Sequence, residues 1–463
     1  MVSIHRYGSY VPFFRLQRSA IGFGRGERAV ASYDEDSISM AVEASREALR
    51  GTEASALDRI VFASVTPPYA EKLNAATVHA ALDLDVSTST QDVGGSTRAG
   101  VSALSDAFDA AGGGRTTLVA ASDVMVGAPG GGRESGSGDA AAAFVIGPGD
   151  GAARLIGRAS STVEVLDTWR TPSMQFAQQW EERFGAEVFV PLYTETIQRA
   201  LADAGLEPGD VSAAVLDATN ARVLRPLAKT TGIAPEAFVG ADFAAEVGRC
   251  GSAHAGLLLA SVLDNAKPGD RVLVGVCADG VDVLVLEVTD GIEAARPAHS
   301  VAQWREAKRD DLAYTSYLKW RGILPFEPPR RPDPERPAAP PMRRAERWKY
   351  AFVGSKCTAC GGVNLPPQRV CVACQAVDQM EDAPYADQPC RIATYTIDRL
   401  AYSLQPPIVA AVVDFAGGGR LNCQLTDVDP ESVGIGDELE MTFRRFFTSG
   451  GVHNYFWKAR PQR

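Results

Sequence analysis

The sequence lacks an uninterrupted apolar run of the roughly 18 residues that a membrane-spanning helix needs. Its opening, MVSIHRYGSYVPFFRL, also lacks the charged start and apolar stretch of a secretory signal. Cysteine is sparse, with eight in 463 residues, which excludes a disulfide scaffold. We therefore expect a cytoplasmic protein with no membrane partner.

Positive charge is also in deficit, because 46 Lys and Arg face 57 Asp and Glu for a net charge of −11. Affinity for nucleic acid depends mainly on clustered Lys and Arg, so we expect no nucleic-acid partner. The exception is segment 301–350, where 12 basic side chains face 7 acidic ones. Apolar residues make up 45% of the chain, as in folded globular proteins, and the length predicts about two to four domains.

Short apolar runs alternate with helical patterns between residues 59 and 289. The runs are RIVFASV, TTLVAASD, AAVLDAT and RVLVGVCADG. Buried strands that alternate with helices predict βαβ units and a largely parallel sheet. Two stretches of this region also resemble one another at an offset of 156 residues, which aligns Ser96 with Ser252 and Asp123 with Asp279. The similar spacing favours a duplicated α/β half over chance agreement in Ala- and Gly-rich sequence.

Proline then separates this region from the rest of the chain. Residues 325–341 contain eight prolines in 17 positions, which predicts an extended polyproline-type arm. Beyond residue 390, short β-type runs separated by turn signals predict a small barrel or sandwich. The expected domains are 1–300 for the α/β part, 301–350 for the basic, aromatic and Pro-rich arm, 351–380 for a zinc ribbon and 381–463 for the barrel.

Four of the cysteines form two CxxC pairs, Cys357 with Cys360 and Cys371 with Cys374. Each pair places two thiolates on one tight turn, and two such turns close a tetrahedral four-sulfur site whose usual occupant is Zn²⁺. Because this shell has no open coordination position, we expect the zinc to be structural. The remaining cysteines are expected to be buried apolar side chains.

A sharp strand-to-helix turn is expected at DVGGSTRAG, residues 92–100, with Ser96 at its centre. Backbone N–H groups at a helix N-terminus stabilise developing negative charge, so this turn is a candidate site. The Gly-rich stretch 127–139 lacks the terminal Gly-Lys-Ser/Thr of a phosphate loop, and we expect it to be a flexible turn.

These motifs resemble the thiolase superfamily, in particular its branch of 3-hydroxy-3-methylglutaryl-CoA (HMG-CoA) synthases and type III ketoacyl synthases. The resemblance rests on IVFASVTPPY, DVGGSTRAG, GSGDAAAAFVIG and EVLDTWRTP, in this order. It implies a duplicated thiolase-like fold with α/β/α/β/α layers, CoA thioesters as substrates or ligands, and a homodimer through the core. We expect the dimer seam near residues 115–122.

The resemblance also implies catalytic positions, and this chain departs from the family at each of them. Ser96 stands where the family has a nucleophilic Cys, Asp217 where it has a His, and Arg249 where it has an Asn. A further Glu is missing at about Val65. Ser96 is either vestigial or substrate-contacting, or it is catalytic. Asp217 and Arg249 either pair with each other, or Asp217 is catalytic and Arg249 binds substrate. His254 is either a structural histidine or a replacement base.

The C-terminal part resembles the zinc-ribbon plus OB-fold domain that accompanies thiolases, from about residue 314 to residue 463. The ribbon is expected to be rubredoxin-type and the barrel to be an OB fold. OB folds can bind single-stranded nucleic acid on stacked aromatics, but we expect barrel core and docking surface instead. The aromatic residues concerned are Phe446, Phe447, Tyr455, Phe456 and Trp457.

These features predict an acyl-CoA-handling subunit of a thiolase- or acyltransferase-type complex that forms or cleaves a C–C bond next to a CoA thioester. Its own condensing site would be degenerate, and a separate thiolase chain would supply the nucleophilic Cys. One alternative is a self-sufficient C-acyltransferase that uses Ser96 or a non-covalent mechanism. A second alternative is a non-catalytic acyl-CoA-binding scaffold.

Overall fold

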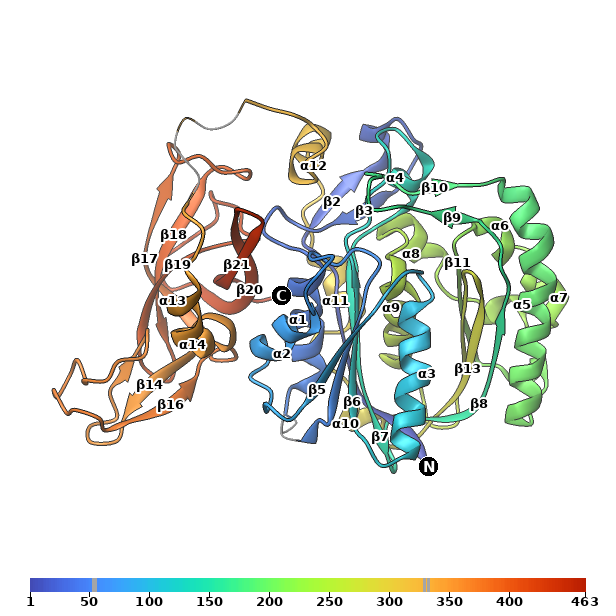
Figure 1. The fold of residues 1–463 in the computed structure, drawn as a ribbon, viewed down its shortest axis with the longest axis horizontal. Coiled ribbons are helices and arrows are strands. Elements are labelled where there is room, and N and C mark those ends of the chain that lie inside the picture. The colour runs from blue at the N-terminus through green and yellow to red at the C-terminus, as the bar shows by residue number, and fades with distance from the viewer. Residues whose placement is uncertain (52–55, 328–329, 331–333) are drawn as a thin grey trace.

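The computed structural model describes residues 1–51, 56–327, 330 and 334–463, and it consists of two parts that lie side by side (Figure 1). The larger part is an α/β body. The smaller part, which follows it in the chain, is mostly β-structure. No helix in the described part of the chain combines the length and apolar character needed to cross a bilayer.

The body is built on one nine-stranded sheet that divides into two halves. The strand order is β11-β12-β13-β8-β1-β7-β6-β4-β5, and the halves meet where β1 pairs with β8 over only Ser3 with Arg154 and Ile4 with Ala153. The strands are β1 (Val2–Tyr10), β4 (Arg59–Ala63), β5 (Ser89–Val93), β6 (Thr117–Asp123), β7 (Ala140–Pro148), β8 (Ala153–Thr162), β11 (Ala213–Ala218), β12 (Arg271–Cys277) and β13 (Gly280–Val288).

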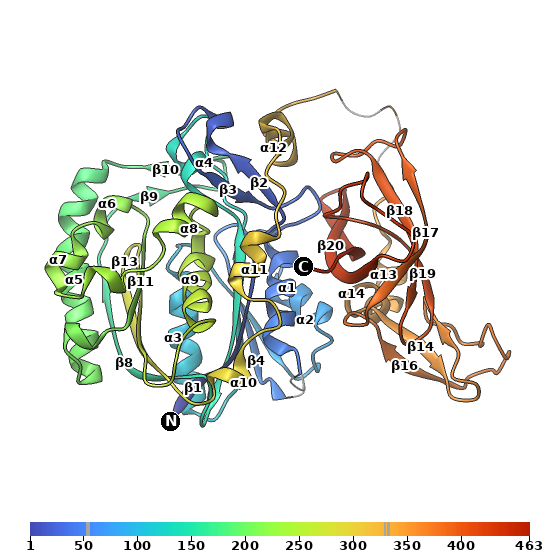
Figure 2. The ribbon, with the colours of Figure 1, turned by 180° about the vertical axis from the view of Figure 1, so that it is seen from behind.

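Helices form three layers around the two half-sheets (Figures 1 and 2). On the outside of one half lie α1 (Ser37–Leu49) and α2 (Ala75–Ala81), and on the outside of the other lies α5 (Glu182–Ala204). Between the halves lie α3 (Ala99–Gly112) and α9 (His254–Leu263). Apolar residues surround α9 on nearly every side, as its central position requires.

The duplication predicted from the 156-residue offset is present in the fold. In one half α3 leads into β6 and β7, and in the other α9 leads into β12 and β13. In the first half, β4 pairs with β5 in parallel. In the second half, the corresponding contact is a parallel bridge between Ala214 of β11 and Phe238. The structure is therefore the layered, duplicated thiolase-like fold that was expected.

Two local expectations are wrong. The predicted dimer seam at 115–122 falls on β6, which pairs with β4 on one side and β7 on the other and has no free edge, whereas β5 is an edge strand of the sheet. The Gly-rich stretch is not simply a flexible turn, because it forms helix α4 (Gly132–Gly136) and contacts another loop. A Cβ at Gly138 would lie 1.8 Å from the Val247 carbonyl oxygen, so only glycine allows this contact.

The arm between the two parts is ordered at both ends. Helices α11 (Val301–Glu306) and α12 (Tyr314–Trp320) pack on the body. Helix α13 (Ala339–Arg344) begins inside the predicted polyproline segment, because prolines fit the first turn of a helix, and α14 (Glu346–Ala351) follows. Residues 328–329 and 331–333 of that segment lie outside the described residues.

The smaller part contains a three-stranded and a five-stranded sheet. The first has the order β15-β14-β16, with β14 (Val353–Cys357), β15 (Val363–Asn364) and β16 (Met380–Pro384). The second has the order β19-β18-β17-β20-β21, with β17 (Cys390–Asp398), β18 (Ile408–Phe415), β19 (Arg420–Gln424), β20 (Glu438–Ser449) and β21 (Val452–Pro461). Tyr455 and Trp457 are buried in the core of this five-stranded sheet rather than displayed on a surface.

Buried ion pairs join the smaller part to the body. Arg444 of β20 lies 2.8 Å from Glu35, and on β21 Lys458 lies 2.8 Å from Asp34. These side chains are almost completely buried, and apolar residues from both parts form one continuous core around them. If the smaller part separated from the body, the buried charges of each would be left without partners. The contact therefore has the character of a permanent interface.

Candidate functional site

Ser96 lies in the turn between β5 and α3, half-buried at the carboxyl end of β5. Ligands of open α/β sheets bind at this end of the strands. Gly95 has a φ of +91°, and a Cβ at Gly94 would lie 2.7 Å from the Ser64 carbonyl oxygen, so glycine is needed at both positions. Among the described residues, the Ser96 Oγ accepts a single hydrogen bond, a long one of 3.4 Å from the backbone N–H of Arg98.

Asp123, at the end of β6, ties the loop that follows β4 to the start of α9. Its fully buried carboxylate accepts hydrogen bonds from Ser64 Oγ, the Val65 N–H, the Thr66 N–H and Oγ1, and the Ser252 N–H and Oγ. Burial raises the pKa of Asp123, and these hydrogen bonds oppose that effect. Val65 occupies the position where the family has a Glu. Its contribution here is the backbone N–H, which donates to Asp123.

The next contact brings the two central helices together. A Cβ at Gly100 of α3 would lie 2.0 Å from the Ser252 carbonyl oxygen, so the helix starts approach as closely as glycine allows. The first turn of α3 therefore lies against the turn that precedes His254.

Asp217, Arg249 and His254 lie together at the carboxyl end of β11. The Arg249 Nε is 3.8 Å from the Asp217 Oδ1, and the Arg249 side chain also donates to the Ala218 carbonyl oxygen. Burial lowers the pKa of His254; Asp217 raises it and Arg249 lowers it, so the imidazole is neutral near pH 7. Within the described residues, neither Asp217 Oδ1 nor His254 Nδ1 has a hydrogen-bond partner.

The structure thus groups three of the four candidate residues by direct or electrostatic contact. Among the described residues, no hydrogen bond or ion pair links Ser96 to Asp217, Arg249 or His254. The roles of Ser96, Asp217, Arg249 and His254 in any reaction remain predictions.

Sequence reasoning missed three charged residues near this site. In the sequence, Asp123 is distinguished only by its alignment with Asp279 at the 156-residue offset. Its hydrogen bonds come from loops that are far apart in the sequence, which local patterns do not reveal. Asp167 lies in the VLDTWRTP stretch, is buried, and accepts a 2.6 Å hydrogen bond from Thr219 Oγ1. Arg98 forms a two-pronged ion pair with Asp282 of β13, at 2.6 and 2.7 Å, which anchors the start of α3.

Two cavities lie away from these residues. The larger, about 990 Å³, is at the amino ends of β4 and β6, near His5, Arg6 and Arg154. The smaller, about 240 Å³, lies between the body and the five-stranded sheet, near Tyr33 and Asp427. Neither cavity is lined by Ser96, Asp217, Arg249 or His254. The candidate site is therefore defined by the positions of its side chains, and neither of these two cavities forms part of it.

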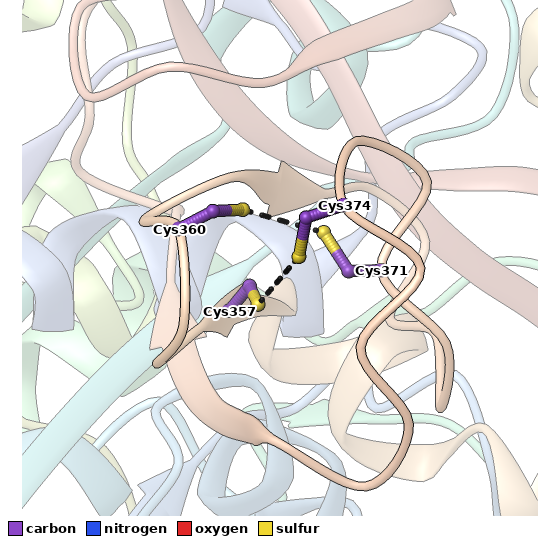
Figure 3. Close-up of side chains that lie close together, drawn as sticks. All are labelled: Cys357, Cys360, Cys371 and Cys374. Atoms are coloured by element: carbon purple, nitrogen blue, oxygen red, sulfur yellow. Dashed lines mark hydrogen bonds between the residues drawn. The ribbon is translucent and has the colours of Figure 1, made fainter.

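The four predicted zinc ligands converge at one end of the three-stranded sheet (Figure 3). The Cys357 and Cys374 Sγ atoms are 3.7 Å apart, the Cys360 and Cys371 Sγ atoms are 3.6 Å apart, and all four lie within 4.8 Å of one another. Zinc–sulfur bonds of about 2.3 Å in a tetrahedron require sulfur atoms about 3.8 Å apart. Two of the sulfur–sulfur distances match this value and the others do not exceed 4.8 Å, so the cluster is close to the size that Zn²⁺ requires.

Three family models match parts of the chain. The model described as "3-Oxoacyl-[acyl-carrier-protein (ACP)] synthase III C terminal" matches residues 201–285. The model described as "ChsH2, rubredoxin-like zinc ribbon domain" matches residues 349–381, and "ChsH2, C-terminal OB-fold domain" matches residues 386–444. The four-cysteine cluster is therefore a zinc ribbon, and the five-stranded sheet belongs to an OB fold.

Curated relatives cover the body. The hydroxymethylglutaryl-CoA synthase of Aeropyrum pernix is 32% identical over 342 residues, which span 69% of this chain and 94% of the relative. The enzyme of the same name from Methanopyrus kandleri is 28% identical over 344 residues, 70% of this chain and 98% of the relative.

Solved structures share the fold of the body. An HMG-CoA synthase complexed with CoA matches with a TM-score of 0.60 at 15% identity, over 69% of this chain and 89% of that one. The 3-oxoacyl-[acyl-carrier-protein] synthase III of Aquifex aeolicus VF5 matches with a TM-score of 0.54 at 21% identity, over 62% of this chain and 100% of that one. Identities this low speak to the fold alone.

Proposed function

The chain belongs to the hydroxymethylglutaryl-CoA synthase family, and from this premise we propose that it is an acyl-CoA-handling subunit of a thiolase- or acyltransferase-type complex. The complex would form or cleave a C–C bond next to a CoA thioester. This chain would bring its zinc ribbon and OB fold, and a separate thiolase chain would bring the nucleophilic Cys. We place the complex in the cytoplasm.

One observation carries this proposal: a carboxylate and a guanidinium, 3.8 Å apart, stand where the resemblance expects a His and an Asn. Thioester condensation needs hydrogen-bond donors at the developing oxyanion, and the Asp217 carboxylate has the wrong sign for that task. Ser96 has no adjacent base among the described residues, and a hydroxyl without a base is a weak nucleophile. Both features support a degenerate condensing site.

A self-sufficient C-acyltransferase is the second candidate. It is favoured by the position of Ser96 at the start of α3, where helix N–H groups stabilise negative charge, and by the buried, neutral His254 with its unpartnered Nδ1. A neutral imidazole can accept a proton, so a non-covalent acid–base reaction is compatible with these residues. In this reading Arg249 contacts substrate.

A non-catalytic acyl-CoA-binding scaffold is the third candidate. It predicts that the chain binds acyl-CoA but does not alter the rate of any thiolase. The first candidate predicts that adding this chain accelerates a partner enzyme, whereas the scaffold predicts no acceleration.

We also propose a homodimer through the body, with β5 at the seam. β5 is one of the two terminal strands of the nine-stranded sheet; the other, β11, has its outer edge bridged at Ala214 by Phe238, whereas the outer edge of β5 would leave backbone groups unpaired. Within the complex, Cys357, Cys360, Cys371 and Cys374 would hold one structural Zn²⁺, and the metal would fix the fold of the ribbon.

The decisive experiment is co-purification of the chain from its native host, followed by mass spectrometry and by assays with a panel of acyl-CoAs. The proposal expects a thiolase to co-purify, little turnover by the isolated chain, and turnover when the two are combined. Full turnover by the isolated chain would instead establish the self-sufficient enzyme. Binding with no effect on any partner would establish the scaffold.

A further inference from the structure

Asp139 is an acid of the body that the proposed function leaves without a role. It directly precedes β7 and is fully buried. Its Oδ1 accepts hydrogen bonds from the Met125 N–H at 2.8 Å and from Arg28 at 3.3 Å. Its Oδ2 accepts one from the Ala31 N–H at 2.8 Å and one from Arg321, with which it forms an ion pair. Each carboxylate oxygen therefore contacts a cation, and one of the two cations belongs to the arm that joins the two parts of the chain.

Arg321 is built into the body and does not lie on its surface. It directly follows α12, and its side chain is almost completely buried. Besides Asp139, it bonds to the Ala31 carbonyl oxygen at 3.0 Å. The guanidiniums of Arg321 and Arg28 also lie 5.4 and 5.1 Å from the ring centre of Tyr317 in α12. A guanidinium that contacts a carboxylate, a carbonyl oxygen and an aromatic ring has a fixed position, so the end of α12 is held against Asp139.

The segment that ends at Asp139 pairs through its backbone with Arg249. The Gly138 N–H donates to the Arg249 carbonyl oxygen at 2.9 Å, and the Arg249 N–H donates to the Gly136 carbonyl oxygen at 3.0 Å. The side chain of the same residue lies at the candidate site, with its Nε 3.8 Å from the Asp217 Oδ1. The position of the segment before Asp139 therefore determines where the Arg249 side chain begins.

We propose that Arg321 is a positioning residue, which holds the Arg249 guanidinium at Asp217 through its own ion pair with Asp139. The inference rests on the proposed function and deepens it, because it names a residue of the arm that acts on the proposed site. A buried carboxylate that loses its cation must move toward another partner or gain a proton, and the backbone attached to it moves as well. Within the described part of the chain, no hydrogen bond or ion pair joins Arg321 to Arg249 or Asp217, so the effect passes through Asp139.

His254 reports the position of Arg249. Burial lowers the pKa of His254, the Asp217 carboxylate raises it, and the Arg249 guanidinium lowers it. Arg321 is not among the charged groups that act on His254, so a substitution there reaches this pKa only by moving the others. If the guanidinium of Arg249 moves away, its lowering effect is lost and the pKa of His254 rises. A purely structural role of Arg321 would leave this pKa unchanged.

The test is an NMR titration of the imidazole signals in the full-length protein, prepared with isotope-labelled histidine. The chain has five histidines, and His254→Gln identifies the His254 signal by its loss. Arg249→Met removes the guanidinium and sets the full size of the pKa rise. Arg321→Met should give about half of that rise, and Arg321→Lys, which keeps a cation beside Asp139, should give less.

A matched control and a second variant keep the result unambiguous. Arg309→Met removes an exposed arginine of the same arm, which pairs with Asp311, and should leave the pKa of His254 unchanged. Asp139→Asn keeps the size of the side chain but gives up the ion pair with Arg321, so it should raise the pKa of His254 as Arg321→Met does. It also serves as the test variant if Arg321→Met does not fold.

A wild-type pKa of His254 in either folded variant would overturn the inference, even where urea unfolding shows that the variant is less stable. An equal rise in Arg309→Met would make the effect a general property of the arm and would overturn it as well. The titration uses no acyl-CoA and no thiolase, so its outcome is independent of the co-purification that tests the proposed function. Failure to find a partner thiolase would refute the proposed function and leave a measured change in the His254 pKa standing.

Discussion

Arg444 of β20 and Glu35 of the body form an ion pair of 2.8 Å in which both side chains are buried, and this pair is one of several that join the two parts of the chain. Arg444 also bonds to Asp427 at 2.5 Å. The guanidinium therefore connects an acid of the body with an acid of the OB fold.

Removing that guanidinium should be strongly destabilising. Arg444→Met leaves Glu35 and Asp427 buried without their shared cation, and we expect a loss of about 3–5 kcal/mol. The measurement is the midpoint and slope of urea unfolding. Arg391→Met is the matched control, because Arg391 pairs with Glu438 on the surface, and it should leave the midpoint nearly unchanged. Equal midpoints for the two variants would contradict a structural role for the buried pair.

The same interface should weaken in acid. Burial alone would raise the pKa of Glu43, but Arg460 and Arg46 outweigh it and lower the pKa to about 2. Because this pKa is below the unfolded value of about 4.5, the stabilisation is complete above pH 4.5 and is lost as the pH falls toward 2.

The expected change is at most about 3 kcal/mol for this one carboxyl. It is measured by urea unfolding at a series of pH values from 6 to 2.5. Glu43→Gln should make the unfolding free energy depend less steeply on pH over this range. Glu438→Gln, on the surface, should leave that dependence unchanged. An unchanged slope in Glu43→Gln would show that this carboxyl does not couple to stability.

Zinc should be present at one ion per chain and should be needed only by the smaller part. Metal binding to a four-thiolate site is coupled to folding, so Cys360→Ala should lose the metal and unfold the ribbon while the body stays folded. Elemental analysis and limited proteolysis measure the two effects. Cys423→Ala, a buried cysteine outside the cluster, should retain the metal. Metal-free protein that was never exposed to a chelator would contradict the assignment.

Ser96→Ala should leave the activity of the complete assembly within a few-fold, because a hydroxyl that is not the acyl acceptor makes no transition-state bond to lose. Ser96→Cys alone should not create condensing activity, since Asp217 still places negative charge near the oxyanion. Intact-mass measurement of acyl adducts with an acyl-CoA panel tests both statements.

Peptide mapping is needed in the same experiment, because Thr97 adjoins Ser96 and also carries a hydroxyl. A covalent adduct on Ser96 of the unmodified protein, formed as fast as turnover, would favour the self-sufficient enzyme over the partner subunit. Adduct-free protein that turns over alone would favour the non-covalent version of that enzyme.

The free edge of β5 predicts a dimer whose mass should be visible by light scattering at micromolar concentration. Gln91→Lys places a charge on this exposed edge and should shift the mass toward the monomer. Val86→Lys, in the exposed loop before β5, is the control. A monomeric wild-type protein at that concentration would refute the dimer.

Patterns that are local in the sequence were sufficient for much of this fold. The spacing of Cys357, Cys360, Cys371 and Cys374 determines a metal knuckle because CxxC geometry involves only adjacent residues. Alternating apolar runs and helical periods similarly indicate the layers. The misplaced dimer seam has a physical reason: the wholly buried pattern of β6 marks a strand paired on both sides, whereas the half-exposed pattern of β5 marks an edge.

Features that depend on distant neighbours were not predictable in this way. The pairing of Arg444 with Glu35 joins residues about 400 positions apart, and neither residue type is unusual in its local sequence. The helix α4 in a Gly-rich stretch depends on the backbone contact of Gly138 with Val247.

The interlocked charges between the two parts also constrain how such chains can diverge. Lys458 and Asp34 are complementary across the interface, so a charge change on one side is tolerated only when the other side changes with it. An OB fold taken from another chain would arrive with unmatched charges and could not replace this one. We therefore expect the two parts to be inherited together, and related sequences should show co-variation between β21 and the segment after β3 (Glu27–Val30).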